Sequence, residues 1–155
     1  MTDAASLIEQ LQHELLDEIP LARAMALRVA AHDGDSLTLA APLAPNINDK
    51  GCAFGGSLAS LMTLAGWGVI RLAVAARGLD CDIYVQDSAI RYLAPVWSDF
   101  DAVSRLADGE SFDAFFATLA TRGKARLNVE CRVPLAEGGD AATLAARFVA
   151  LVKQP

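Results

Sequence analysis

The sequence predicts an α+β domain in which a curved antiparallel sheet wraps around one long central helix. The stretch from about Gly55 to Gly78 has the length of a long helix and is apolar on nearly every face, so it needs cover around most of its circumference. The segments on either side of it alternate between apolar and polar residues, as half-buried strands do. Because strands twist, several of them can cover a helix only by curling around it. A length of 155 residues leaves room for a single domain over residues 1–155.

The residues before the central helix predict a helix and then a hairpin. Between residues 3 and 17 apolar residues recur at helical spacing, and Pro20 ends the run. Residues 26–31 and 36–39 then alternate as two strands, joined by the turn at residues 33–35. After the second strand we expect a loop, because the following residues are rich in Asn, Asp, Gly and Pro.

The residues after the central helix predict the rest of the sheet, interrupted by one short helix. The helix is expected between Ser111 as its N-terminal cap and Gly123 as its stop, because Phe112, Phe115 and Leu119 share one helical face. Alternation is clearest after this helix, where every second residue is apolar. The strands are expected at residues 83–93, 99–106, 125–133 and 143–152.

Composition excludes several classes of function. Thirteen Lys and Arg residues against 19 Asp and Glu give a net charge of −6, which argues against a nucleic-acid partner. Three cysteines without CxxC spacing and only two histidines predict neither a disulfide framework nor a metal site, and no cofactor. We expect a reduced, cytoplasmic protein without an export signal. The uncharged stretch Gly51 to Ile70 contains five glycines, which favours a buried helix over a membrane span.

Two segments resemble a known family. PNINDKGCAFGGSLASLMTLAGWG (Pro45 to Gly68) and DSAIRYLAPV (Asp87 to Val96) are similar to the hotdog-fold thioesterase superfamily, and most similar to its YiiD C-terminal putative thioesterase branch. The resemblance implies the hotdog fold and at least a homodimer. It also implies acyl-thioester sites at the subunit interface, which bind esters of coenzyme A (CoA) or of acyl carrier protein (ACP).

The superfamily pattern N-x-x-G-x-x-H-G-G, with an acidic residue seven positions after the last glycine, is only partly present. The residues that keep their places are Asn48, Gly51, Gly55 and Gly56. Phe54 stands at the histidine position and Thr63 at the acidic position. The carboxylate that usually orients or activates water is therefore missing from this helix, and Phe54 and Thr63 are expected to contact substrate instead.

The start of the central helix is the first candidate site. Backbone N–H groups of Gly55, Gly56 and Ser57 would be free there to bind the oxyanion that forms during thioester hydrolysis. The alternative is that the glycines only permit a tight turn into a buried helix. Asn48 has an amide that could hold a water or the carbonyl, or could instead cap its own turn.

Asp87 is the second candidate. Alternation in its strand predicts that it shares an apolar face with Val85 and Ala89, and a carboxylate buried without a partner is costly. Asp87 is therefore either neutralised by Arg91, four residues on, or acts as the general base for water. Cys52, just before the helix, is a weaker alternative as a nucleophile, because no base is near it in sequence.

A basic segment completes the candidates. Arg122, Lys124 and Arg126 place three positive charges within five residues of an acidic chain. They could dock a nucleotide phosphate or the carrier of the thioester, or they could form an ordinary solvated face.

We therefore expect a hotdog-fold homodimer, or higher homo-oligomer, that hydrolyses an acyl-CoA or acyl-ACP thioester. In this mechanism Gly55 and Gly56 bind the oxyanion, while Asn48 and Asp87 handle water. The alternative is a non-catalytic module that binds acyl thioesters, which the missing histidine and acid favour. A dehydratase is a third reading, but it needs a pair of a histidine and an acid that this chain lacks near the motif.

Overall fold

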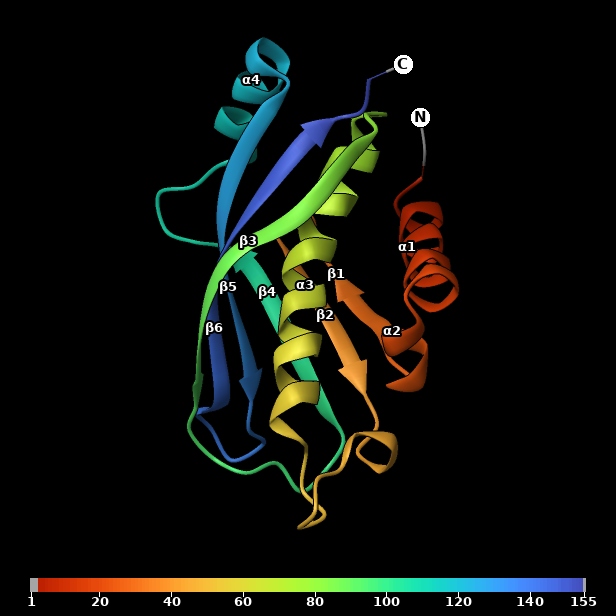
Figure 1. The fold of residues 1–155 in the computed structure, drawn as a ribbon, viewed down its shortest axis with the longest axis vertical. Helices are drawn as coiled ribbons and strands as arrows, with labels where there is room; N and C mark the ends of the chain where they lie inside the picture. Colours follow the sequence, from red (N-terminus) through yellow and green to blue (C-terminus); the bar gives the residue numbers. More distant parts are fainter. Residues whose placement is uncertain (1–2, 155) are drawn as a thin grey trace.

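The computed structural model describes residues 3–154, and it shows a six-stranded antiparallel sheet curled around the long helix α3 (Figure 1). The strand order is β1-β2-β4-β5-β6-β3, so β1 and β3 are the edge strands. The α+β class and the wrapped sheet expected from the sequence are confirmed. The elements are α1 Ala4–Glu18, α2 Pro20–Ala24, β1 Arg28–His32, β2 Ser36–Ala41, the 3₁₀ turn η1 Ala44–Asn46, α3 Gly55–Ala76, β3 Cys81–Tyr92, β4 Phe100–Leu106, α4 Phe112–Arg122, β5 Lys124–Pro134 and β6 Asp140–Val152.

Local signals in the sequence set several of these boundaries. The Ser111 hydroxyl accepts a hydrogen bond from the Ala114 N–H at the start of α4, and Gly123 ends the helix at a φ of 68°. Both ends of this helix are confirmed. Pro20 ends α1 as expected, but it also begins the short helix α2, because a proline at the first helical position loses no hydrogen bond.

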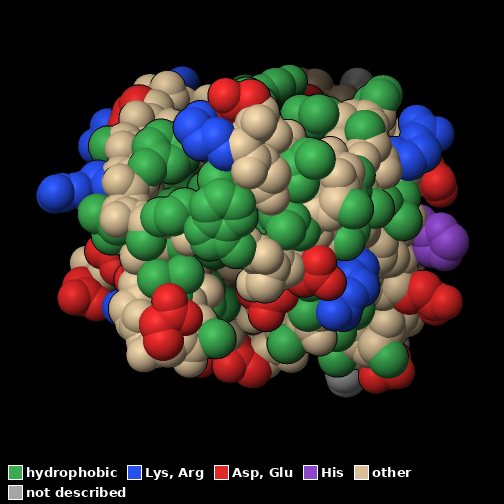
Figure 2. Space-filling view, turned by 90° about the horizontal axis from the view of Figure 1, so that it is seen from below, with side chains coloured by type: hydrophobic (Ala, Val, Ile, Leu, Met, Phe, Trp, Pro, Cys, Tyr) green, Lys and Arg blue, Asp and Glu red, His purple; other side chains and the backbone are tan. Residues whose placement is uncertain are grey.

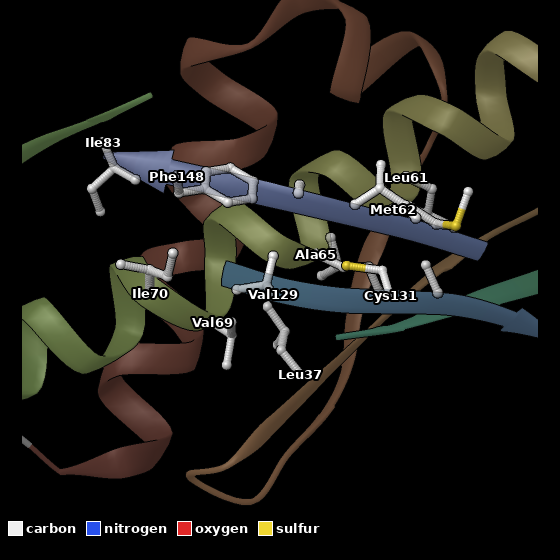
Figure 3. Packing of buried hydrophobic residues seen from close by; sticks show 14 of the residues in the cluster. Leu37, Leu61, Met62, Ala65, Val69, Ile70, Ile83, Val129, Cys131 and Phe148 are labelled. Carbon is white, nitrogen blue, oxygen red and sulfur yellow. The ribbon is translucent and has the colours of Figure 1, made fainter. Parts of the chain in front are cut away.

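The core lies between α3 and the concave face of the sheet (Figure 3). Phe148 of β6 and Val129 of β5 approach α3 so closely that a Cβ atom on Gly66 would lie 3.0 Å from each of them. Ser104 of β4 is fully buried, and its hydroxyl donates a 2.7 Å hydrogen bond to the Ala65 carbonyl of α3. The small residue and the buried hydrogen bond together hold α3 at a short, fixed distance from the sheet.

The sheet covers only one side of α3. Ten of its 22 residues are buried, whereas Ser60, Thr63, Leu64 and Trp67 on the other side are partly exposed. The expectation of a helix buried all round is therefore wrong for a single chain. By length and composition α3 could cross a membrane, but 56% of the most apolar part of the helix is buried against the rest of the protein.

The edge strand β3 is also uncovered. From Tyr84 to Tyr92 nearly all of its side chains are exposed, including both tyrosines. An exposed edge strand leaves backbone N–H and C=O groups that can pair with another strand. One chain thus leaves both an edge of its sheet and a side of its central helix open.

Replacing Gly66 by valine tests the close packing of α3. The new side chain would collide with Phe148 and Val129, so we expect the free energy of unfolding to fall by about 2 kcal/mol. Urea denaturation at a fixed protein concentration measures this difference. The control is Ala76→Val at the exposed end of the same helix, and equal stability of the two variants would contradict the packing.

Candidate functional site

The first turn of α3 presents two free backbone donors. The helix begins at Gly55, and Phe54 before it supplies no side-chain cap. N–H groups in a first turn have no partner inside the helix, and those of Gly55 and Gly56 find none elsewhere in residues 3–154. The Ser57 N–H, by contrast, donates to the Phe54 carbonyl at 2.9 Å. The prediction that Ser57 also offers a free donor is therefore wrong, because the turn tightens at that residue.

The loop before α3 is held by Asn46. Its buried side-chain amide donates to the carbonyls of Met25, at 2.9 Å, and Pro42, at 2.8 Å. Its own carbonyl accepts a 2.7 Å hydrogen bond from the Phe54 N–H. Asn46 thus fixes the residue that immediately precedes the free donors.

Asn48 lies beside the helix start, and its side-chain amide makes some of its hydrogen bonds within its own turn. Its Oδ1 accepts a 2.8 Å hydrogen bond from the Lys50 N–H, and its Nδ2 lies 3.2 Å from the Cys52 sulfur. Asn48 and Gly55 line the same hollow, of about 440 Å³. An amide has two N–H groups and two lone pairs, so Asn48 keeps one of each for a ligand.

Two aromatic rings flank the glycine pair. The Phe54 ring lies against Gly56, where it would collide with any added Cβ atom, and the Tyr92 hydroxyl donates to the Gly55 carbonyl at 3.3 Å. Both side chains are more than half exposed. Leu93 and Trp97 are exposed as well, and apolar side chains cover much of this end of the molecule (Figure 2). The free donors therefore lie within an apolar surface.

A β-bulge overturns the predicted position of Asp87. In the pairing of β3 with β6, Val85 lies opposite the buried Phe148, but Asp87 lies opposite the exposed Arg147. The extra residue, Gln86, reverses the alternation, so Asp87 is on the outer face of the sheet and exposed. The prediction of an apolar face for Asp87 is wrong, because a bulge depends on the partner strand and leaves no mark in the alternation.

The same bulge turns Tyr92 toward α3. From Ser88 onward, the residues opposite buried β6 positions are Ser88, Ile90 and Tyr92. Simple alternation along the strand, without the bulge, would place Tyr92 on the face away from α3. Tyr92 lies five residues along the strand from Asp87, so the two residues are about 16 Å apart. Within one chain, Tyr92 is therefore at the helix start and Asp87 is not.

The basic segment lies at the opposite end of the sheet. Arg122 ends α4, and Lys124 and Arg126 are among the first residues of β5. The helix start is near the other end of β5, where Val133 pairs with Ala142. Nine residues of strand span about 30 Å, so the structure does not bring these three residues to Gly55 within one chain.

The hollow beside Gly55 differs from the superfamily pattern in its chemistry. Among the described residues that line it, none is acidic or a histidine, and Lys50 is the one charged residue. The hydrogen bond from the Lys50 ammonium lowers the pKa of Asp49, which is exposed beside it. Thr63 is on α3, and its hydroxyl donates a 2.8 Å hydrogen bond to the Ala59 carbonyl, which is a common bond of a helical threonine to its own helix. In residues 3–154 no three metal-ligating side chains gather.

A curved antiparallel sheet around one long central helix is the arrangement of the hotdog class of proteins. Over residues 8–152 the chain matches the YiiD_C family, described as putative thioesterase, and it belongs to that family.

Solved structures agree with this assignment. A putative thioesterase from Shewanella oneidensis is 31% identical, with 95% of this chain and 99% of that chain covered and a TM-score of 0.83. A protein of unknown function from Chlorobaculum tepidum TLS is 30% identical over 97% of each chain, with a TM-score of 0.90. A third structure, from Pseudomonas aeruginosa, has a TM-score of 0.78 with 94% of this chain and 95% of that chain covered, and at 22% identity it supports the fold alone.

Replacing Asn46 by alanine tests how the helix start is held. The change leaves the carbonyls of Met25 and Pro42 without their donor, so we expect the free energy of unfolding to fall by about 2 kcal/mol. Urea unfolding measures this free energy, and the control is Asn128→Ala, a substitution at an exposed residue. If Asn46→Ala were as stable as the control, Asn46 would not hold the loop.

Proposed function

We propose that this protein hydrolyses an acyl thioester at the start of α3. The observation that carries the proposal is the pair of unpartnered N–H groups of Gly55 and Gly56, at the positive end of a 22-residue helix and beside a hollow of about 440 Å³. Such donors stabilise the oxyanion of acyl transfer. Membership of a putative thioesterase family supports the same reaction.

The reaction balances with water as the only co-reactant. Water attacks the carbonyl carbon, the N–H groups of Gly55 and Gly56 bind the developing oxyanion, and the C–S bond then breaks to give a carboxylic acid and a thiol. The free N–H and lone pair of Asn48 hold the attacking water. Phe54 and Tyr92 contact the ester from either side, and Ser57 and Thr63 contact it farther along α3.

We further propose that two chains pair along the free edges of β3. This pairing would cover exposed β3 residues such as Tyr84 and Val85, and the open side of α3. The substrate site then lies at the dimer interface. Asp87 faces away from α3 in its own chain, and edge-to-edge pairing would keep it on the outer face of the joined sheet, so this pairing does not support the proposed role of Asp87 as the base for water.

The same pairing assigns a role to the basic segment. Antiparallel strands place the far end of one chain beside the near end of the other. Arg122, Lys124 and Arg126 of a second copy are thus proposed to attract the negatively charged carrier, either CoA or ACP. All three cysteines are buried free thiols, which fits the proposed cytoplasmic location.

A non-catalytic module that binds acyl thioesters is the second candidate. It is favoured by a specific observation, the absence of a carboxylate and of a histidine among the described residues that line the hollow. Such a module would use the same oxyanion donors to hold the thioester carbonyl. Release of free thiol from a panel of acyl-CoA esters separates the two candidates, because only the hydrolase releases it.

Gly56→Val tests the position of the oxyanion site. A side chain at this residue would displace the Phe54 ring and block approach to the amides, so we expect kcat/KM to fall by at least about 100-fold. Thiol release measures the rate, and circular dichroism checks that the variant folds. Full activity of a folded Gly56→Val protein would place the oxyanion site elsewhere.

Thr63→Asp tests whether a missing base limits turnover. Thr63 lies seven residues, or about two turns, after Gly56, and so on the same face of α3. A general base contributes roughly 10²- to 10⁴-fold, so kcat should rise if the carboxylate is ionised. The gain should grow with pH, because partial burial raises the pKa of a new aspartate.

The control for this variant is Thr63→Asn, which has nearly the same shape but cannot accept a proton. Hydrolysis is compared from about pH 6 to pH 9, the range over which a raised carboxyl pKa would titrate. An equal gain in both variants, or no gain in a folded Thr63→Asp protein, would contradict the idea that water activation is what this site lacks.

A further inference from the structure

A second hollow, of about 580 Å³, lies on the outer face of the sheet, on the side away from α3. Its floor is made of small side chains from β3 and β6, namely Ala89, Thr143 and Ala145, which are neighbours in the strand pairing. Longer side chains from β3, β4 and β5 stand around this floor. The volume is within the range of about 300 to 1,000 Å³ that is usual for small-molecule sites.

Three arginines from three different strands line this hollow: Arg91 of β3, Arg105 of β4 and Arg132 of β5. Arg132 pairs with Asp140 at 2.9 Å, and Arg105 reaches Glu130 only at 3.7 Å. The side chain of Arg91 has no hydrogen-bond or ion-pair partner among residues 3–154. Each guanidinium has five N–H donors, so most of the donors around the hollow remain free.

The outer hollow is next to the proposed catalytic hollow. Arg91 lines the first, and Tyr92, the following residue of β3, lines the second. The residues after Tyr92, up to Pro95, also line the catalytic hollow, so the end of β3 is what separates the two. A flexible chain that passes this strand end would join them without crossing the sheet.

We propose that the outer hollow binds the phosphorylated nucleoside end of CoA, while the pantetheine arm passes the end of β3 to the helix start. This inference rests on the proposed thioester hydrolysis and selects CoA over ACP as the carrier. Guanidinium groups bind phosphates through two parallel N–H donors, which suits Arg91 and Arg105. The carboxylates of Glu130 and Asp140 supply acceptors for the amino and hydroxyl groups of a nucleoside.

Calorimetric titration with adenosine 3′,5′-bisphosphate tests the site without requiring turnover. The wild-type protein should bind it, and Arg91→Ala should weaken binding about tenfold, because a charge-assisted hydrogen bond is lost. The matched control is Arg28→Ala, an exposed arginine on β1 outside both hollows, which should bind like the wild type. No binding to the wild type, or equal binding by Arg91→Ala, would overturn the proposal.

A pair of substrates with the same acyl group then links the site to catalysis. Arg91→Ala should raise KM about tenfold for the acyl-CoA and leave KM unchanged for the acyl-pantetheine, which lacks the nucleotide. An equal rise in KM for both substrates would overturn the nucleotide site in the outer hollow. A rise in KM for the acyl-CoA that is found only in Lys124→Ala would overturn it as well. If the wild type bound the bisphosphate but hydrolysed neither ester, the hydrolase proposal would fail and the nucleotide site would stand.

Discussion

The first turn of α3 is the constraint on which the rest of the structure depends. Its N–H groups at Gly55 and Gly56 lack acceptors in the described part of the chain, and unpaired backbone donors are stable only where water or a ligand can reach them. Asn46 holds the preceding loop through two buried hydrogen bonds, and Gly66 lets α3 lie close against the sheet. The fold thus keeps two aligned donors rigid and open, which a loop by itself would not do.

The uncovered side of the fold follows from the same arrangement. A sheet of six strands reaches only part of the way around α3, so Thr63 and Trp67 stay partly exposed and β3 keeps a free edge. Covering both by a second chain would also enclose the helix start, and water exclusion strengthens every electrostatic interaction inside a site. Dimerisation and catalysis would then depend on one interface.

Features that depend on neighbouring residues in the sequence could be predicted, whereas features that depend on a partner strand could not. The ends of α4 were predictable because Ser111 and Gly123 act within one turn of the helix. The faces of Asp87 and Tyr92 were not predictable, because the bulge at Gln86 is decided by the pairing of β3 with β6. The arginine hollow was missed for the same reason, since four strands that are distant in sequence build it.

A second copy that pairs along β3 is proposed to complete the site, and sedimentation combined with hydrogen exchange tests this pairing. The pairing predicts a particle of twice the 16.3 kDa of one chain at micromolar concentration. It also predicts slow exchange of the β3 amides, because pairing with a second strand protects them from water. A stable 16.3 kDa monomer with rapidly exchanging β3 amides would contradict it.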